Sequence, residues 1–581
     1  MATILYIAID FGTSYSGYAF SFKSDFNQEQ IWIPSWGMGQ GQKTFKTPTC
    51  ILFDEEENFQ KFGYEALRTY TLAMKKEQTM NHYLFEHFKM ELYNTEIHRD
   101  LMITASNGKT MKAIKVFSES LRFLKDHALA KIEEITEERK FVASDVTWVL
   151  TVPAIWPAVA KQFMREAAVE AGLVTNATPE RLIFALEPEA ASVFCKQLPS
   201  DGFIAEGEGQ ETLEQQPGSQ YMVVDCGGGT IDITVHEVLD NGNLKELQAA
   251  SGNSMGGQTV DKNIMSFLKD IFSEEIFEKF LKEQPGEALK LKNDITMIKS
   301  CDDDVMLTCP VGLQELAKDK QSIESYFEDV QGAEWDDGGI FIEREKLQSF
   351  FDTSFSAIES KINQILQKPE LRIEYMLLVG GYAESSFLRK FMRKQFGSKH
   401  KILCPAEPQV VILKGAIRYG KTPTMVKSRI SALTYGSCIC KSFDETKHKD
   451  KSKYINSRGE VFCDVCFQQL VSSGESVESD EVRSFIRSPA DPLQTGIVFR
   501  FYSSERQKVQ FVDEDGVAQI GSLSVDIPNT DRGMDRQVRL QIKFGSTEMQ
   551  ATATDLESGE SRSTRLDFMS NSVHRHNKIC A

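Results

Sequence analysis

The sequence lacks the features of membrane-spanning, secreted and nucleic-acid-binding proteins. No segment has about 18 uninterrupted apolar residues, and the short apolar run before Asp10 lacks a basic leader, so we expect no transmembrane span and no signal peptide. Basic residues are in deficit: 66 Lys and Arg stand against 84 Asp and Glu, a net charge of −18. Such a charge disfavours nucleic acids and anionic membranes, so we expect partners to be proteins or small molecules.

Cysteine is also sparse. The 11 cysteines among 581 residues are an odd number spread from Cys50 to Cys580, which excludes a small disulfide-rich scaffold and favours reduced thiols. The cytoplasm is the expected compartment, with the nucleus left open.

The chain is too long for one hydrophobic core, so three or four domain-sized units are expected.

The cysteines of the C-terminal region raise the question of a metal site. Cys438 and Cys440 precede Cys463 and Cys466 in segments that alternate like strands. Strand periodicity places Cys438 and Cys440 on one face, but Cys463 and Cys466 on opposite faces. We therefore expect separate core and surface thiols rather than a zinc site, with redox sensitivity as the alternative. The charged segment 444–453 is expected to be a solvated hairpin tip.

Up to Lys421, strand-like runs alternate with amphipathic helical runs, as in an α/β protein. Beyond Thr422, short alternating segments separated by polar turns indicate antiparallel β structure. Residues 198–220 have no apolar period and are expected to form an exposed loop between the two halves of the α/β part.

Two similar segments, IAIDFGTSYSGYAF from Ile7 and VVDCGGGTIDITV from Val223, each predict a strand, an Asp-x-Gly turn and a second strand. Asp10 and Asp225 enter turns in which glycine lets backbone N–H groups approach an anion closely. Two further glycine turns occur in SGNSMGGQTVD from Ser251 and in MLLVGGYAES from Met376. One such turn is weak evidence because any tight turn uses glycine, but four together favour a polyphosphate site.

The order of these motifs resembles the ATPase domain of the 70-kilodalton heat-shock protein family, within the actin and sugar-kinase superfamily. VLTVPAIWPAVAKQFMREAAVEAGL and LEPEAAS stand between the hairpins, where that family has VPAYF, a helix ending in AGL, and NEPTAAA. HYLFEHFKMELY, GYAESSFL, LKGAIRYG and the β region look like the atypical 12A/12B subfamily. The implied fold is an actin-like ATPase of duplicated ribonuclease H-like halves, followed by a β-rich substrate-binding-like domain without a helical lid.

The resemblance implies lobe I over 1–197 and lobe II over 198–421, whose final helix packs back on lobe I. A linker over 422–433, a β-rich domain over 434–568 and a polar tail over 569–581 follow. It also implies ATP or ADP with Mg²⁺ as the ligand. Asp10, Asp225 and Glu187 would hold the metal through water, since Mg²⁺ dehydrates reluctantly.

The catalytic residues implied by the resemblance are Asp10, Lys89, Glu187, Asp225 and Thr230. The implied nucleotide-binding residues are Gly12, Thr13, Ser14, Tyr15, Gly227, Gly228, Gly229, Gly256, Gly257, Lys299, Gly380, Gly381 and Tyr382. Ordinary alternatives stay open: turn capping for the aspartates, a helix N-terminal charge for Glu187, and a solvated helix face for Lys89.

The sequence departs from the family pattern in four places. The adenosine helix keeps only Lys299, beside Thr296 and Ser300, and Tyr382-Ala383-Glu384 replaces Ser-x-Arg, so base selectivity is open. The linker segment KTPTMVKSRISAL from Lys421 is basic and poor in large apolar residues, so we expect it not to pair as a β-strand. Only 13 residues follow Phe568, too few for a lid, and the tail lacks the EEVD signature, so tetratricopeptide co-chaperones are not expected.

Three functional hypotheses follow. The first is an atypical family member that binds ATP, hydrolyses it slowly as a weak ATPase, and acts as a stress-related chaperone or regulator of protein clients. The second is a nucleotide-gated signalling scaffold with vestigial chaperoning. The third is a small-molecule kinase of the same superfamily, which the β-rich C-terminal part disfavours.

Overall fold

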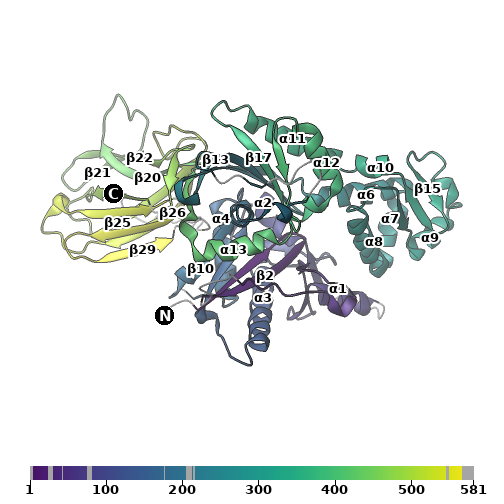
Figure 1. Ribbon diagram of the computed structural model, residues 1–581. Coiled ribbons are helices and arrows are strands. Elements are labelled where there is room, and N and C mark those ends of the chain that lie inside the picture. The colour runs from purple at the N-terminus through teal and green to yellow at the C-terminus, as the bar shows by residue number, and fades with distance from the viewer. Residues whose placement is uncertain are drawn as a thin grey trace.

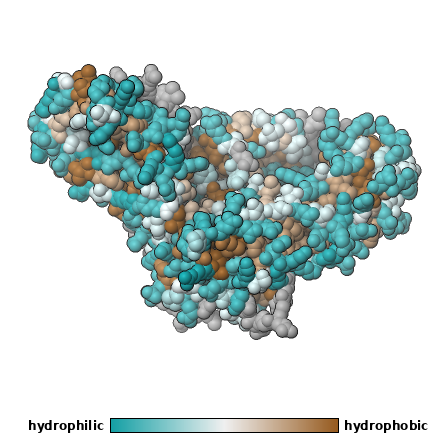
Figure 2. All heavy atoms as spheres, turned by 90° about the horizontal axis from the view of Figure 1, so that it is seen from above, coloured by the Kyte–Doolittle hydropathy of each residue, from teal (hydrophilic) through white to brown (hydrophobic). Residues whose placement is uncertain are grey.

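The computed structural model describes residues 4–23, 30–41, 43–74, 82–175, 177–204, 212–213, 216–479, 481–544, 549–565 and 569. An α/β part carries a β-rich domain at one end (Figure 1). Within the described residues, no helix is both long and apolar enough to cross a membrane. The face in Figure 2 is mainly hydrophilic, with apolar residues in separate groups.

The first lobe is built on a five-stranded sheet in the order β10-β9-β1-β2-β3. Its strands are β1 (Leu5–Phe11), β2 (Tyr15–Phe22), β3 (Thr47–Pro48), β9 (Val146–Val152) and β10 (Leu182–Leu186). The antiparallel pair β1 and β2 is the expected first hairpin. Strand β9 runs parallel to β1, and β10 runs parallel to β9. All seven residues of β9 are buried, because helices cover a parallel strand on both faces.

Shorter strands and, among the described residues, five α-helices make up most of the rest of this lobe. They are β4 (Cys50–Phe53), β5 (Phe59–Phe62), β6 (Tyr83–Glu86), β7 (Met102–Thr104), β8 (Thr110–Lys112), α1 (Tyr64–Met74), α2 (Glu91–Asn94), α3 (Ala113–Ile135), α4 (Ala158–Glu170) and α5 (Glu187–Cys195). The apolar faces of α3 and α4 pack on the sheet, and their buried residues form its main core.

The second lobe is built on a seven-stranded sheet in the order β18-β17-β11-β12-β13-β19-β23. Its strands are β11 (Gln220–Cys226), β12 (Ile231–Val238), β13 (Leu244–Asn253), β17 (Ile373–Val379), β18 (Lys401–Leu403), β19 (Val426–Ile430) and β23 (Ser476–Glu478). β11 and β12 form the expected second hairpin, and β17 runs parallel to β11. Duplication of ribonuclease H-like halves stays a prediction.

Helices and a small sheet complete the second lobe, with α6 to α10 and β15 on the right of Figure 1 and α13 near its centre. They are α6 (Gly257–Phe272), α7 (Glu274–Glu283), α8 (Pro285–Ile298), α9 (Val311–Lys318), α10 (Arg344–Ser349), α11 (Asp352–Leu366), α12 (Ser386–Phe396), α13 (Val411–Lys421), β14 (Val305–Thr308), β15 (Ala333–Asp336) and β16 (Gly339–Ile342). The helix α13 packs against α5 of the first lobe, so closely that a Cβ on Gly415 would lie 1.7 Å from the Ala190 carbonyl oxygen.

The expectation that the linker does not pair as a β-strand is wrong. Residues Val426–Ile430 form β19, which runs parallel to β13 and antiparallel to β23. One buried ion pair and one hydrogen bond take the place of the large apolar side chains that the segment lacks: Arg429 pairs with Glu189, and the Ile430 N–H donates to Glu246. The linker therefore joins the sheet of lobe II and carries β23 of the following domain with it.

The β-rich domain is a sandwich of two antiparallel sheets, ordered β21-β22-β20-β25-β26 and β24-β27-β28-β29. The strands are β20 (Thr434–Ser442), β21 (Lys453–Ile455), β22 (Val461–Val471), β24 (Val482–Arg487), β25 (Gly496–Ser504), β26 (Val517–Asp526), β27 (Val538–Lys543), β28 (Gln550–Asp555) and β29 (Ser561–Arg565). Alternating apolar residues of both sheets form one core between them. The tail lies outside the described residues except at Met569.

Candidate functional site

The two hairpin aspartates are buried at the ends of their strands. Asp10 ends the apolar part of β1, where its Oδ1 accepts from the Thr151 hydroxyl at 3.0 Å and its Oδ2 lies 2.5 Å from Lys46 Nζ. Asp225 occupies the matching place on β11 and is 3 % exposed. Its Oδ1 is buried with no hydrogen-bond partner among the described residues, and its pKa is raised well above the ordinary value by burial and by Glu187.

Glu187 and Lys89 form a buried ion pair next to these aspartates. Glu187 begins α5, and its Oε1 accepts from Lys89 Nζ at 2.9 Å. Lys89 is 3 % exposed and its ammonium also lies 5.1 Å from the centre of the Trp156 ring. The solvated-face alternative for Lys89 is therefore wrong. Burial raises the pKa of Glu187 to about 7, with Lys89 opposing the shift and Asp10 adding to it.

Sequence reasoning missed Lys46, Thr151 and Asp232. Asp232 follows the glycine turn on β12, is buried, and accepts from the Ile155 N–H at 2.9 Å. Burial also raises its pKa. Its position in DCGGGTID, two residues after Thr230, is a signal from which the sequence could have predicted it, because a buried aspartate in a strand needs a polar partner. Lys46 carries no such signal, since only the tertiary fold places it on Asp10.

The glycine turns of the two hairpins face each other and touch. A Cβ on Gly228 would lie 2.2 Å from Ser14 Oγ, and one on Gly229 would lie 2.7 Å from Thr13 Oγ1. The Gly227 N–H donates to the Thr230 carbonyl at 3.0 Å, which closes the second turn. Only residues without a side chain permit so close an approach, so the glycines here have a packing reason beyond turn geometry.

The other predicted glycines lie around the second turn. Gly256 and Gly257 lead into α6, and the Gly257 N–H donates to the Gly227 carbonyl at 3.0 Å. In the first turn, a Cβ on Gly12 would lie 2.3 Å from the Tyr15 carbonyl oxygen. The glycine turns predicted to cradle phosphate are thus brought together.

Gly380 packs directly on Asp225. It has a φ of 86°, and a Cβ there would lie 2.5 Å from Asp225 Oδ1, whereas one on Gly381 would meet nothing within 4 Å. The VGG turn after β17 therefore helps to position the aspartate, which only a residue without a side chain allows.

The side chains predicted to contact adenosine have other partners. Lys299 Nζ lies 2.6 Å from Asp261 Oδ1 and 3.2 Å from the Gly257 carbonyl oxygen. The Tyr382 ring is buried and packs near Gly257, with Phe351 stacked 6.2 Å away. Tyr15, which is predicted to contact phosphate rather than adenosine, is 38 % exposed. These contacts do not test base recognition, which stays a prediction.

The site as a whole has more buried negative than positive charge. Asp10, Asp225, Asp232 and Glu187 face only Lys46 and Lys89 in the contacts described above, and three of the four carboxyl groups have raised pKa values. An excess of buried carboxylates needs a cation or protons. Oxygen ligands suit Mg²⁺, and the unpartnered Asp225 Oδ1 is an available one, so the residues present fit that ion.

The helix α5 connects this site to the linker strand. Glu189 lies two residues after Glu187, is 0 % exposed, and accepts from Arg429 of β19 through both carboxylate oxygens at 2.8 and 2.7 Å. Arg429 also donates to the Tyr419 hydroxyl at 3.0 Å. The first turn of α5 thus holds both a site carboxylate, Glu187, and the anchor of the linker, Glu189.

Comparison with known proteins agrees with this arrangement. The family model described as Hsp70 protein matches residues 8–420. Mouse heat shock 70 kDa protein 12A is 33% identical, over 97% of this chain and 92% of the mouse protein. The human 12A protein is 32% identical with the same coverage, and human 12B is 32% identical over 97% of this chain and 91% of its own length.

Proposed function

Because this chain belongs to the Hsp70 family, we propose that it binds Mg²⁺ with ATP between its two glycine hairpins, hydrolyses the nucleotide slowly, and regulates protein clients. The observation that carries the proposal is the buried carboxylate cluster from both hairpins, with Asp225 Oδ1 unpartnered where the turns meet. The proposal draws on the family for the identity of the nucleotide and on this geometry for the residues.

The residues divide into metal, phosphate and proton-handling groups. Asp10 and Asp225 would hold Mg²⁺ through water, and the bound ion would neutralise charge on the phosphates. Backbone N–H groups of the two turns would bind the phosphate oxygens. These donors act by positioning and electrostatics, which supply most of the catalysis in phosphoryl transfer.

Glu187 is suited to handle the proton of the attacking water. A carboxyl group with a pKa of about 7 is present in both protonation states near neutral pH, as general base catalysis requires. Lys89, paired with Glu187 at 2.9 Å, would hold the carboxylate in place and offer its charge to the phosphate. Both roles follow from the proposed nucleotide position.

The client role rests on the β-rich domain. The linker strand β19 ties this domain to the lobe II sheet, so a nucleotide-dependent change in the lobes has a direct route to it. Suppression of client aggregation that depends on ATP would support chaperoning. Capture of a specific partner without suppression of aggregation would favour the scaffold alternative.

A calorimetric titration of the full chain with Mg-ATP tests the nucleotide site. We expect saturable binding that Asp225→Asn weakens at least about tenfold, since it removes a buried charge from the metal site. Asp336→Asn, at an exposed position of β15, is the matched control and should bind like the natural protein. No binding, or equal binding by both variants, contradicts the proposal.

A further inference from the structure

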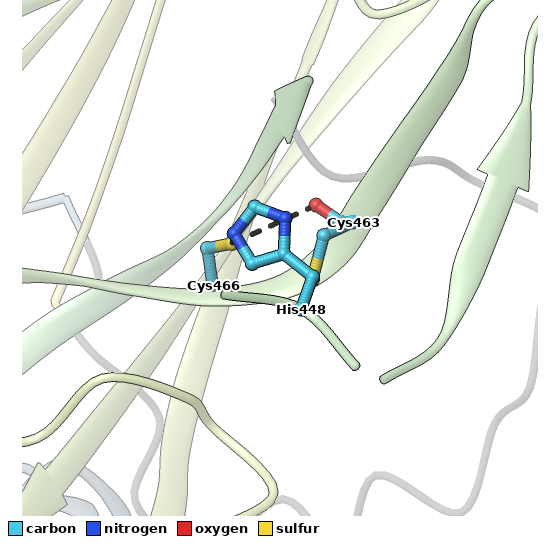
Figure 3. A group of neighbouring side chains, drawn as sticks. All are labelled: His448, Cys463 and Cys466. Carbon is cyan, nitrogen blue, oxygen red and sulfur yellow. Dashed lines mark hydrogen bonds between the residues drawn. The ribbon is translucent and has the colours of Figure 1, made fainter. Parts of the chain in front are cut away.

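A second group of potential metal ligands lies in the β-rich domain, far along the chain from the nucleotide site. His448, Cys463 and Cys466 are all buried, and one ligand atom of each lies within 4.8 Å of the others. Figure 3 shows the imidazole of His448 beside both cysteine side chains. The distance from His448 Nε2 to Cys466 Sγ is 3.8 Å.

A β-bulge brings the two thiols together. Ile439 of β20 pairs with Cys466 of β22, and Lys441 pairs with Cys463. An advance of two residues along β20 thus corresponds to three residues along β22. The extra residue reverses the alternation, and both cysteines pack with Ile439 in one small cluster. The expectation that Cys463 and Cys466 point to opposite faces is therefore wrong.

Cys438 and Cys440 behave as expected. Both lie on one face of β20, where they pack with Phe467 in a different cluster, away from Ile439. Neither belongs to the group of three ligands. The CxC pair therefore supplies a control on the same sheet rather than further ligands.

The third ligand comes from the charged segment 444–453. His448 is only 7 % exposed, although the residues around it in this segment are mostly exposed, so the solvated-tip expectation fails at this residue. The rings of Phe443 and Phe511 lie 5.4 and 6.0 Å from its imidazole, and Lys451 pairs with Asp513 at 2.8 Å. These contacts hold the segment on the sheet and the imidazole over the thiols.

We propose that His448, Cys463 and Cys466 bind a Zn²⁺ ion through Nε2 and two thiolates, with water as the fourth ligand. Sulfur and imidazole nitrogen are ligands that Zn²⁺ prefers and Mg²⁺ avoids. Tetrahedral bonds of about 2.3 Å to sulfur and about 2.0 Å to nitrogen place nitrogen and sulfur about 3.5 Å apart and the two sulfurs about 3.8 Å apart. The observed 3.8 Å between Nε2 and Cys466 Sγ is about 0.3 Å longer than that nitrogen–sulfur separation, so a small shift of the two side chains completes the geometry.

Zinc binding has a defined proton balance and a local structural consequence. Each thiol releases its proton to solvent when its sulfur binds the metal, and the imidazole proton resides on Nδ1 once Nε2 is a ligand. In the structure, Nδ1 accepts the Asp444 N–H at 3.0 Å. That N–H must turn away on zinc binding, so the Asp444 amide should exchange its hydrogen faster in the zinc-loaded protein.

The test uses the full chain, treated with a chelator and then titrated with Zn²⁺ alone or Co²⁺ alone, without nucleotide. We expect tight binding of one Zn²⁺ and thiolate-to-cobalt charge-transfer absorption. His448→Asn, Cys463→Ser and Cys466→Ser should each weaken binding at least about 100-fold, because loss of even an outer-shell contact costs 10–100-fold. Cys438→Ser, on the other face of the same sheet, should bind like the natural protein.

Two results overturn the proposal. One is the absence of the cobalt charge-transfer band in the natural chain, a measurement that depends on no variant. The other is zinc affinity in His448→Asn equal to that of Cys438→Ser, with both variants showing natural thermal unfolding. His448→Asn is the variant expected to keep the fold intact, because the histidine lies in the segment between β20 and β21 rather than in a strand.

Discussion

The ion pair between Arg429 and Glu189 should decide whether the linker strand stays in the lobe II sheet. Glu189 is fully buried and the Arg429 side chain is 11 % exposed, with two short hydrogen bonds between them. Arg429→Met keeps the length of the side chain but leaves a buried carboxylate without its cation. Removing one partner of a buried pair costs about 3–5 kcal/mol. The ratio of docked to undocked linker should therefore fall by roughly 10²–10³-fold or more.

Hydrogen exchange of the amides of β19, followed by mass spectrometry, measures this ratio locally. Exchange in Arg429→Met should speed up by the same factor until it reaches the rate of an exposed strand. Lys427→Met removes the same charge from an exposed position of the same strand and is the matched control. A double variant with Glu189→Gln should recover much of the protection, because it removes the unpaired charge.

Equal exchange in Arg429→Met and Lys427→Met would refute the reasoning. It would mean that main-chain pairing to β13 and β23 holds the linker by itself, or that Glu189 is neutral when unpaired and costs little. The single variant Glu189→Gln separates these explanations. It leaves the exchange of β19 unchanged if main-chain pairing is sufficient, but it speeds exchange in the second case, because Arg429 is then a buried cation without its partner.

Three further predictions concern pH, packing and catalysis. Burial raises the pKa of Glu246 to about 8, so between about pH 4.5 and pH 8 this group is protonated in the folded state and ionised in the unfolded state. Its contribution to the free energy of unfolding is therefore fully present below about pH 4.5 and falls towards pH 8, by up to about 1.4 kcal/mol for each pH unit. Thermal unfolding of Glu246→Gln, measured against pH, should lack this component. Gly228→Ala should displace Ser14, which costs about 1–3 kcal/mol of folding free energy, and should lower Mg-ATP affinity at least about fivefold in calorimetry. Gly39→Ala is the control, because a Cβ there meets only a distant side chain and should leave the affinity unchanged. Glu187→Gln should slow phosphate release about 10²–10⁴-fold while Mg-ATP still binds, and unchanged turnover would exclude its role as base.

The two glycine hairpins were predictable because their information is local. An apolar run, an aspartate and a glycine turn fall within about a dozen residues, and both segments form the expected antiparallel pairs. The contacts between the hairpins were not predictable, because Ser14 lies near the start of the first lobe and Gly228 lies in the second. Lys46 reaches Asp10 for the same reason: its position depends on a loop path that no periodicity records.

The linker shows where composition misleads. Its lack of large apolar residues predicts that it does not dock, but a strand also docks through main-chain pairing and through a charge buried against a complementary one. Nothing in KTPTMVKSRISAL indicates that Glu189 lies opposite Arg429, since that pairing requires α5 to face β19.

By itself, the sequence determined the family, the two hairpins, the change from α/β to β structure near Thr422, and the residue types available for a nucleotide site, because all of these are written in short segments with a fixed order. Only the tertiary structure decided that four carboxylates share a site with two lysines, that the linker is a strand, and that one bulge turns Cys463 and Cys466 to the same side as His448. The physical reason is the same in each case: charge pairing, strand pairing and ligand geometry depend on distances between segments, which the order of residues along the chain does not specify.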